Sequence, residues 1–418
     1  MKTSPVKLPK ETRIICLPFS RTSYPNIVET PELFRHELDE KITCFPELFP
    51  KEIEQGYLMK DSRVSKRLKL LTRRIKVGKY SYTIRPSFVT PYWTGFVDDV
   101  EKALFLRKFA IPFWALTYVF GHSDMYWYRL EQHIGHVSIV GTTVRNPDDL
   151  PEHLVADEKH SKDRGEKCYV ATTCGSNCVF GASIAMKADE ASLTDAYGVF
   201  KTEARQLKAD YQPKTVNTDG WGATILAWQT LFSSILIIAC FLHIYIKLRD
   251  RAKVKFKELF GEVADKLWDC YKSPTKASFS QRLRRLDEWL QAKEAPDFMQ
   301  ERVAKMRVNK TSFTAAYDYS EAHRTSNAVD RLMGFMDRYL FATRYFHGKY
   351  WIAAEYSIRS WALIYNFAPS NPTTVRLHHG LKSPAECLNQ FRYHENWLQN
   401  LLISSSQKGV FVPPLNAR

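Results

Sequence analysis

The chain has 418 residues, of which 44% are hydrophobic and 25% charged, a balance that is ordinary for a globular protein and argues against disorder. This length allows two or three domains with sizeable cores. Lysine and arginine outnumber aspartate and glutamate by 60 to 45, which gives a net charge of +15. Such a surplus favours a polyanion partner, DNA or RNA before a membrane, and a cationic surface without a ligand is the alternative.

The 8 cysteines are scattered and form no Cys-x-x-Cys pair. This pattern fits neither a zinc finger nor a disulfide framework in a chain of this size. Residues 1–13 contain no apolar segment of the kind found in a secretory signal. Together these features predict a cytoplasmic protein.

The N-terminal part, residues 1–97, is expected to be a basic region that is Pro-rich and irregular up to residue 60. A run of lysines and arginines follows, in which Arg73 and Arg74 are candidates for DNA contacts. The alternating stretch over residues 80–89 predicts a strand pair.

Residues 98–145 predict three short helices joined by tight turns. A proline at position 112 suits the first turn of a helix, and Ser123 is a good N-cap after a glycine stop. The arrangement is compatible with a helix-turn-helix-like DNA-binding region in which Tyr126, Tyr128 and Arg129 face DNA. A plain helical bundle with an aromatic core is the alternative.

The pattern becomes alternating β/α over residues 146–249. A strand is expected to end at Asp157, followed by strands over 167–173 and 177–186, an amphipathic helix and a strand over 214–219. Residues 225–246 are apolar enough for a transmembrane helix. The polar turn before them and an internal Ser-Ser break favour a buried helix over 223–232, a strand over 235–241 and a second helix. No membrane association is therefore expected.

The remaining chain is mostly helical. Residues 250–320 are highly charged and predict a helical insertion, and a further helical block spans about 326–366. Residues 321–418 are assigned to the helices that complete the core and to the C-terminal tail.

Two aspartates each follow an apolar strand pattern. Metal-dependent phosphoryl transfer on DNA needs carboxylates that converge from separate elements in this way. Asp157 follows an apolar strand pattern, and Asp219 ends another strand and precedes a glycine. A single aspartate at a strand end is ordinarily a turn residue. Two of them in a βββαβ order instead indicate a site at which converging carboxylates hold divalent cations.

The run Thr218-Asp219-Gly220-Trp221, followed by Trp228, Leu231-Phe232 and Cys240-Phe241-Leu242-His243, resembles the Mutator-like and related insertion-sequence transposases. The resemblance implies a DDE-type enzyme. Its fold would be an α/β, RNase-H-like catalytic domain with a mixed five-stranded sheet, flanking helices and a helical insertion. Cys240 and His243 lack a second ligand pair, so a structural role near the active site is predicted for them.

The same resemblance implies an activity and its partners. The enzyme would cleave phosphodiesters at the element's terminal inverted repeats and transfer the 3′-OH into target DNA, with two Mg²⁺ (or Mn²⁺) ions. It would act as a homodimer or larger homo-oligomer on DNA and associate with the nucleoid. A catalytically inactive, transposase-derived DNA-binding protein is the alternative.

The third acid has two candidates. Asp330 matches the Thr-Asn-x-x-Glu type of signature in its spacing, with Asp in place of Glu, and falls early on a helix with an apolar stripe. Glu321 is the alternative, although it precedes the helix. Nearby, Arg324 and Arg331 are candidates for phosphate contacts, and Trp221 for stacking on a base.

Near the C-terminus, Tyr365-Asn366 and the stretch from Val375 to Glu386 resemble the ending of many integrase-like transposases. Physically, Ser383-Pro384-Ala385-Glu386 is a capping box that begins a helix.

Overall fold

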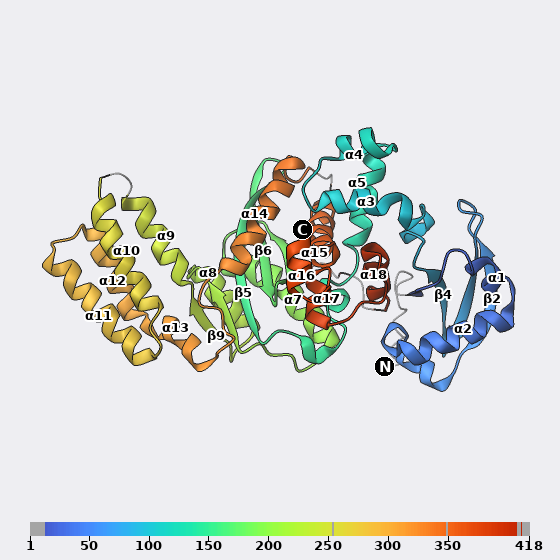
Figure 1. The fold of residues 1–418 in the computed structure, drawn as a ribbon, viewed down its shortest axis with the longest axis horizontal. Coiled ribbons are helices and arrows are strands. Elements are labelled where there is room, and N and C mark those ends of the chain that lie inside the picture. Colours follow the sequence, from blue (N-terminus) through green and yellow to red (C-terminus); the bar gives the residue numbers. More distant parts are fainter. Residues whose placement is uncertain (1–12, 253–254, 348–349, 408–410, 412–418) are drawn as a thin grey trace, which may run out of the picture.

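The computed structural model describes residues 13–252, 255–347, 350–407 and 411. Apart from Arg13, the segment inspected above for a secretory signal lies outside these ranges. The protein is a mixed α/β structure with an elongated outline: a four-stranded sheet at the N-terminal end, a five-stranded sheet in the middle and a helical bundle at the far end (Figure 1). In the part of the chain that the structure describes, no helix has the length and apolar character needed to cross a membrane.

The N-terminal sheet has the strand order β1-β4-β3-β2. Its β1/β4 pair is parallel and its other pairs are antiparallel. The expected strand pair is present, but the stretch 80–89 supplies only β4, and its antiparallel partner β3 lies in the basic run. The strands are β1 (Ile14–Leu17), β2 (Leu58–Val64), β3 (Leu71–Val77) and β4 (Tyr80–Pro86).

The expectation that residues up to 60 are irregular was wrong. Helix α2 (Pro31–Cys44) begins with a proline, which suits the first turn of a helix, and buries Phe34 and Leu38, four residues apart on one face. Burial of this face in the hydrophobic core stabilises a helix that composition alone did not reveal. The other elements here are α1 (Tyr24–Glu29) and the 3₁₀ turns η2 (Pro46–Leu48) and η3 (Lys51–Gln55).

The three short helices predicted after residue 97 are present. They are α3 (Val97–Arg107), α4 (Phe113–Phe120) and α5 (Asp124–Ile134). The predicted cap is confirmed, because the Ser123 side chain accepts a hydrogen bond from the amide of Tyr126. On the inner face of α5, Arg107 and Glu131 form a fully buried ion pair. Around these helices lie η4 (Pro91–Trp93), α6 (Ile139–Thr143) and η5 (Pro147–Asp149).

The central sheet has five strands in the order β7-β6-β5-β8-β9, so the predicted mixed five-stranded sheet with flanking helices is confirmed. β5, β6 and β7 are joined as antiparallel neighbours, whereas β5, β8 and β9 run parallel. The elements are β5 (His153–Asp163), β6 (Glu166–Gly175), β7 (Cys178–Ala185), α7 (Glu190–Leu207), β8 (Thr215–Thr218), α8 (Gly222–Leu231) and β9 (Leu236–Ala239).

Helices cover both faces of this sheet. Because successive strand residues point to opposite faces, Leu154 and Ala156 pack with α7 and α8, whereas Val155 belongs to the core on the side of α14 (Asn327–Ala342) and α15 (Trp351–Phe367). The prediction that a strand ends at Asp157 was wrong. β5 continues for six residues beyond it because its second half pairs with β6.

The expected helix, strand and helix after Asp219 are confirmed as α8, β9 and α9 (Phe241–Ala252). A helical bundle follows, at the end of the molecule opposite the N-terminal sheet (Figure 1). It has its own core, which includes Leu267, Phe279 and Leu283. Its helices are α10 (Lys257–Tyr271), α11 (Lys276–Ala292), α12 (Asp297–Val308) and α13 (Lys310–Thr314), and η6 (Ala315–Asp318) leads back to the sheet.

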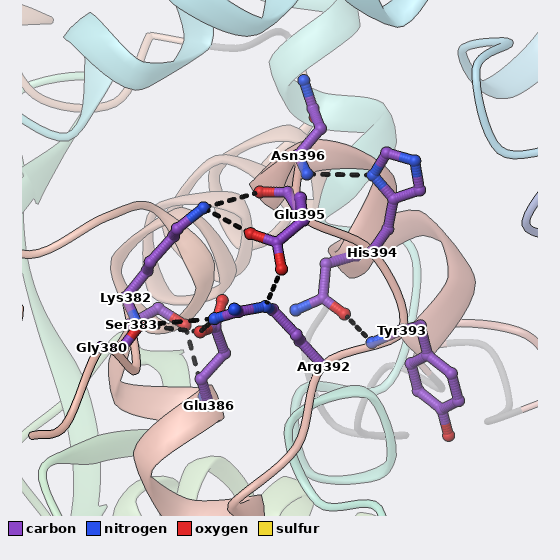
Figure 2. Close-up of polar contacts among 10 residues, drawn as sticks. Gly380, Lys382, Ser383, Glu386, Arg392, Tyr393, His394, Glu395 and Asn396 are labelled. Carbon is purple, nitrogen blue, oxygen red and sulfur yellow. Dashed lines mark hydrogen bonds and ion pairs between the residues drawn. The ribbon is translucent and has the colours of Figure 1, made fainter.

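The C-terminal segment folds back against the centre of the molecule (Figure 1). Half of the predicted capping box is present, because Ser383 accepts a hydrogen bond from the amide of Glu386. The Glu386 side chain accepts from the amide of Lys382 rather than from that of Ser383. The buried Glu386 is held by Arg392, which also pairs with Glu395 (Figure 2). These contacts fix α16 (Pro372–Leu377), α17 (Pro384–Asn389) and α18 (Trp397–Ser404).

Candidate functional site

Asp157 lies on β5, and Asp219 directly follows the neighbouring parallel strand β8. β5 pairs with β8 in a register that places Val155 beside Asn217, and each paired residue is 62 positions from its partner. Asp157 and Asp219 have the same separation, two residues further along each strand. Parallel strands bring their carboxyl ends to one edge of a sheet, so the two carboxylates converge where β8 ends.

Asp330 approaches from the helix that covers this face. Asp157 has the same side-chain direction as Val155 and therefore faces α14, in whose first turn Asp330 lies. Two turns further along α14, Asp337 forms an ion pair of 2.6 Å with Lys159, the next β5 residue on the same face. The helix thus lies along the strand, and the predicted third acid is next to the first.

Burial and neighbouring carboxylates act together on Asp157. They raise the pKa of Asp157 to about 7, with desolvation as the main cause, followed by Glu158 and by the more distant charges of Asp219 and Asp330; the backbone amide of Glu158 opposes the shift. The negative charge on this group is therefore poorly compensated. A bound cation would supply the missing positive charge.

His243 completes a group that could hold a metal ion. One ligand atom from each of Asp157, His243 and Asp330 lies within 4.8 Å of the others. Opposed ligands about 2.1 Å from a common cation are about 4 Å apart, so small side-chain movements would bring these three into coordination distance. The donor set of two carboxylates and an imidazole is also chemically suitable for a divalent ion.

Ser326 and Cys240 connect two members of this group. The Ser326 hydroxyl donates a hydrogen bond of 2.8 Å to Oδ2 of Asp330 and lies 3.5 Å from Nδ1 of His243. The Cys240 thiol donates to the Ser326 hydroxyl and accepts from the Ser326 amide, both at 3.2 Å. Cys240 therefore has the predicted structural role beside the site, through a serine that sequence reasoning missed.

Asp219 lies beside this group but is not part of it. One of its carboxylate oxygens accepts a hydrogen bond from the amide of Trp221 in the turn at Gly220, whose φ of +87° favours glycine. The other oxygen lies 3.7 Å from the ammonium of Lys247. Lys247 follows His243 by one turn on α9, so one helix provides both the imidazole and a cation.

Glu158, although adjacent to Asp157, belongs to the opposite face of the sheet. Its carboxylate accepts hydrogen bonds from the hydroxyls of Tyr197 and Thr224 on α7 and α8. Burial is the main cause that raises the pKa of Glu158. It is a satisfied core acid rather than a member of the site.

Glu321, the alternative third acid, is exposed and lies elsewhere. Its carboxylate is close enough to interact electrostatically with His153 and Lys214, which lie at the beginnings of β5 and β8. Asp157 is four residues further along β5, and about 3.3 Å per residue puts it more than 10 Å from that end. The structure therefore brings Asp330, and not Glu321, to the aspartates.

The arginines predicted to contact DNA near the site differ in their surroundings. The guanidinium of Arg324 is enclosed by the rings of Tyr271 and Tyr317 and bonds to the Tyr317 hydroxyl, so it joins α10 to η6. Arg331 is exposed in the first half of α14. Trp221 is half-buried and packs against the ring of Tyr169 on β6. Only Arg331 keeps the accessible charge expected of a phosphate contact.

The N-terminal candidates lie on the far side of the central sheet from the helical bundle (Figure 1). Arg73 donates to the last carbonyls of α1, and Arg74 pairs with Asp61 across β2 and β3. Arg129 is exposed on α5. Arg73 and Arg74 are thus engaged within the domain, whereas Arg129 is accessible.

Sequence reasoning missed Lys247, and it gave His243 a structural role, whereas the structure groups His243 with Asp157 and Asp330 as possible metal ligands. The signal for His243 was its place just after β9, next in the sheet to the strand that ends at Asp219. Lys247 had no signal of its own, because its importance rests on being one helical turn from His243. In comparisons with known proteins, no family model and no curated protein sequence matched this chain.

Proposed function

We propose that the protein is a DDE-type transposase with an RNase-H-like catalytic domain. The observation that carries the proposal is the approach of Asp330, on a covering helix, to Asp157 at the edge of the central sheet where Asp219 follows the neighbouring parallel strand. Carboxylates gathered in this way are the arrangement that metal-dependent phosphoryl transfer requires.

The order of the elements supports this fold. RNase-H-like enzymes place one acid on the first strand of the sheet, another at the end of the fourth and the last on a later helix. In this chain β5, β8 and α14 stand in those places, and the bundle α10–α13 falls between the second and third acids. The strand order, with the first strand in the centre, is also the one expected of that fold.

The residues have distinct tasks in the proposed reaction. Asp157, Asp330 and His243 would hold Mg²⁺ or Mn²⁺, which supplies Lewis-acid activation and neutralises charge on the phosphate. Asp219 extends the site towards Lys247, whose ammonium would attract a phosphate oxygen. Water attacks the phosphorus at the element end and frees a 3′-OH, which then attacks a target phosphodiester. No covalent protein–DNA intermediate is needed.

An exposed basic surface supports DNA as the substrate. The hairpin between β2 and β3 carries exposed Arg63, Lys66 and Arg67. Burial raises the pKa of Tyr126 on α5, and the charge of Arg67 is close enough to oppose that shift. The hairpin therefore lies near α5, and its three cations together with the exposed Arg129 of α5 are called the basic face. Terminal repeats and target DNA would be its ligands, bound by a homodimer or larger homo-oligomer.

A second candidate is a transposase-derived DNA-binding protein that no longer cuts DNA. The observation in its favour is the ion pair between Lys247 and Asp219, which places a side-chain cation where a second metal ion would be expected. In that case the basic face would function without the carboxylates.

A cleavage and strand-transfer assay distinguishes the two candidates. Its substrates are the DNA segments that flank the gene on each side, where the terminal inverted repeats are expected. With Mg²⁺ or Mn²⁺ the wild type should nick and join these ends, and Asp157→Asn, Asp219→Asn and Asp330→Asn should lose at least about a hundredfold in rate. Asp337→Asn, an exposed aspartate two turns along α14, is the matched control and should remain active. Binding without cleavage by the wild type would refute the enzyme and favour the second candidate.

A further inference from the structure

His243 stands where the third parallel strand delivers its side chain to the carboxylates. β9 pairs with β8 up to Ala239, and α9 begins at Phe241, so His243 lies in the first turn after the strand. This is the same edge of the sheet at which Asp157 and Asp219 meet. Asp157 on β5, Asp219 directly after β8 and His243 in the first turn after β9 thus all lie at this edge of the central sheet.

The ring of His243 and the carboxylate of Asp330 both lie next to the hydroxyl of Ser326. The Ser326 hydroxyl contacts both, and Ser326 is itself fixed by two hydrogen bonds with the buried Cys240. Groups that hydrogen-bond to metal ligands orient them and tune their affinity. An imidazole and a carboxylate that share one neighbouring hydroxyl are therefore placed to act on the same cation.

We infer that His243 is a nitrogen ligand of the site's cation and that this site binds Mn²⁺ in preference to Mg²⁺. The inference rests on the metal site of the proposed function, but not on DNA cleavage. Mg²⁺ favours oxygen ligands in a strict octahedron and gives up water reluctantly, whereas imidazole suits transition metals. The site offers two carboxylates and one imidazole. Mn²⁺ can use the imidazole nitrogen as a ligand, whereas Mg²⁺ uses it poorly.

A purely electrostatic role for His243 is the competing explanation. A protonated imidazole would neutralise the adjacent carboxylates without binding metal. The two explanations differ in a spectroscopic property, because only a coordinated nitrogen transfers spin density from Mn²⁺ to the ring.

Pulsed electron paramagnetic resonance on the full-length protein, stripped with a chelator and reloaded with Mn²⁺, tests the inference directly. Bound Mn²⁺ should show ¹⁴N modulation in the wild type and lose it in His243→Gln. The variant should also bind Mn²⁺ at least about tenfold more weakly. Removal of a residue that only hydrogen-bonds to a metal ligand already costs about tenfold in affinity, and removal of a ligand should cost no less. His160→Gln, an exposed histidine further along β5, should leave signal and affinity unchanged.

Mg²⁺ competition completes the experiment. An excess of Mg²⁺ should be needed to displace Mn²⁺ from the wild type, and the preference should shrink in His243→Gln. Absence of Mn²⁺ binding, bound Mn²⁺ without ¹⁴N modulation, modulation that persists in His243→Gln, or displacement by an equal concentration of Mg²⁺ would each overturn the inference. A nitrogen-coordinated ion in a protein that does not cut DNA would refute only the proposed enzyme, and DNA cleavage with Mg²⁺ but no ¹⁴N signal would refute only this inference.

Discussion

The ammonium of Lys247 lies 3.7 Å from Oδ2 of Asp219, one turn of α9 beyond His243. Helix α9 therefore provides an imidazole to one part of the carboxylate site and an ammonium group to the other. A divalent ion that approaches Asp219 must compete with this lysine.

Replacement of Lys247 should strengthen cation binding. Lys247→Ala removes a half-exposed positive charge, and a change of up to about 1 kcal/mol, roughly fivefold in Mn²⁺ affinity, is expected from an ion pair of this exposure. Isothermal titration at low salt measures the change. Lys247→Arg keeps the charge and should bind as the wild type does; equal affinities for both variants would show that Lys247 does not compete with the cation.

Removal of the Ser326 hydroxyl should loosen two ligands at once. In Ser326→Ala, Asp330 loses its 2.8 Å hydrogen bond and the Cys240 thiol loses its acceptor. Mn²⁺ affinity should fall by about tenfold, as for other groups that orient metal ligands. Thr325→Ala, the adjacent half-buried residue, is the control. If both variants bind Mn²⁺ equally well, Ser326 does not position the site.

The buried Glu355 on α15 should make stability depend on pH. Its carboxylate accepts from the hydroxyl of Ser183 and the amide of Ile184 on β7, and burial is the main cause that raises the pKa of Glu355 from 4.5 to about 7. The folded state thus binds this proton more tightly than the unfolded state. Its stabilising effect is complete below pH 4.5 and is lost as the pH rises towards 7.

Denaturant unfolding of wild type and Glu355→Gln checks this dependence. Between about pH 5 and about pH 8 the wild type should lose on the order of 3 kcal/mol relative to the variant, whose amide does not titrate. Parallel pH profiles for the two proteins would contradict the prediction.

The ion pair between Arg107 and Glu131 should be costly to break. Both side chains are fully buried between α3 and α5, and Glu131 also accepts a hydrogen bond from the hydroxyl of Tyr339 on α14. Arg107→Met leaves an uncompensated carboxylate and should reduce the unfolding free energy by about 3–5 kcal/mol. In Arg107→Met/Glu131→Gln the buried charge is absent and much of this loss should be recovered. A single variant as stable as the wild type would show that the pair does not fasten α5 to the core.

DNA affinity should depend on exposed rather than engaged arginines. Arg67→Ala on the β2–β3 hairpin should weaken binding to any duplex and reduce the slope of log affinity against log salt by about 0.9, the value for one lost phosphate contact. Arg74→Ala, whose guanidinium is bound to Asp61, should change the slope much less. Fluorescence anisotropy at several salt concentrations measures both, and equal slopes for wild type and Arg67→Ala would exclude the hairpin from the DNA-binding face.

Local sequence patterns determined much of this protein. The spacing of apolar residues identified the strands β6 to β9 and the helices α7 to α9, and Ser123 and Ser383 marked helix starts, because these features depend on neighbours along the chain. The same patterns singled out Asp157 and Asp219, since a polar residue after an apolar strand is visible in one dimension. The missed helix α2 had a weak pattern of its own and is stabilised by the burial of Phe34 and Leu38 in the core.

Only the tertiary structure decided which side chains act together. The register of β5 and β8 aligned the two aspartates, the path of α14 along β5 selected Asp330 over Glu321, and the position of α9 added His243 and Lys247. Arg324 became part of an aromatic enclosure for the same reason. Electrostatics and coordination depend on distances of a few ångströms between residues far apart in sequence, and those distances are set by packing rather than by any local pattern.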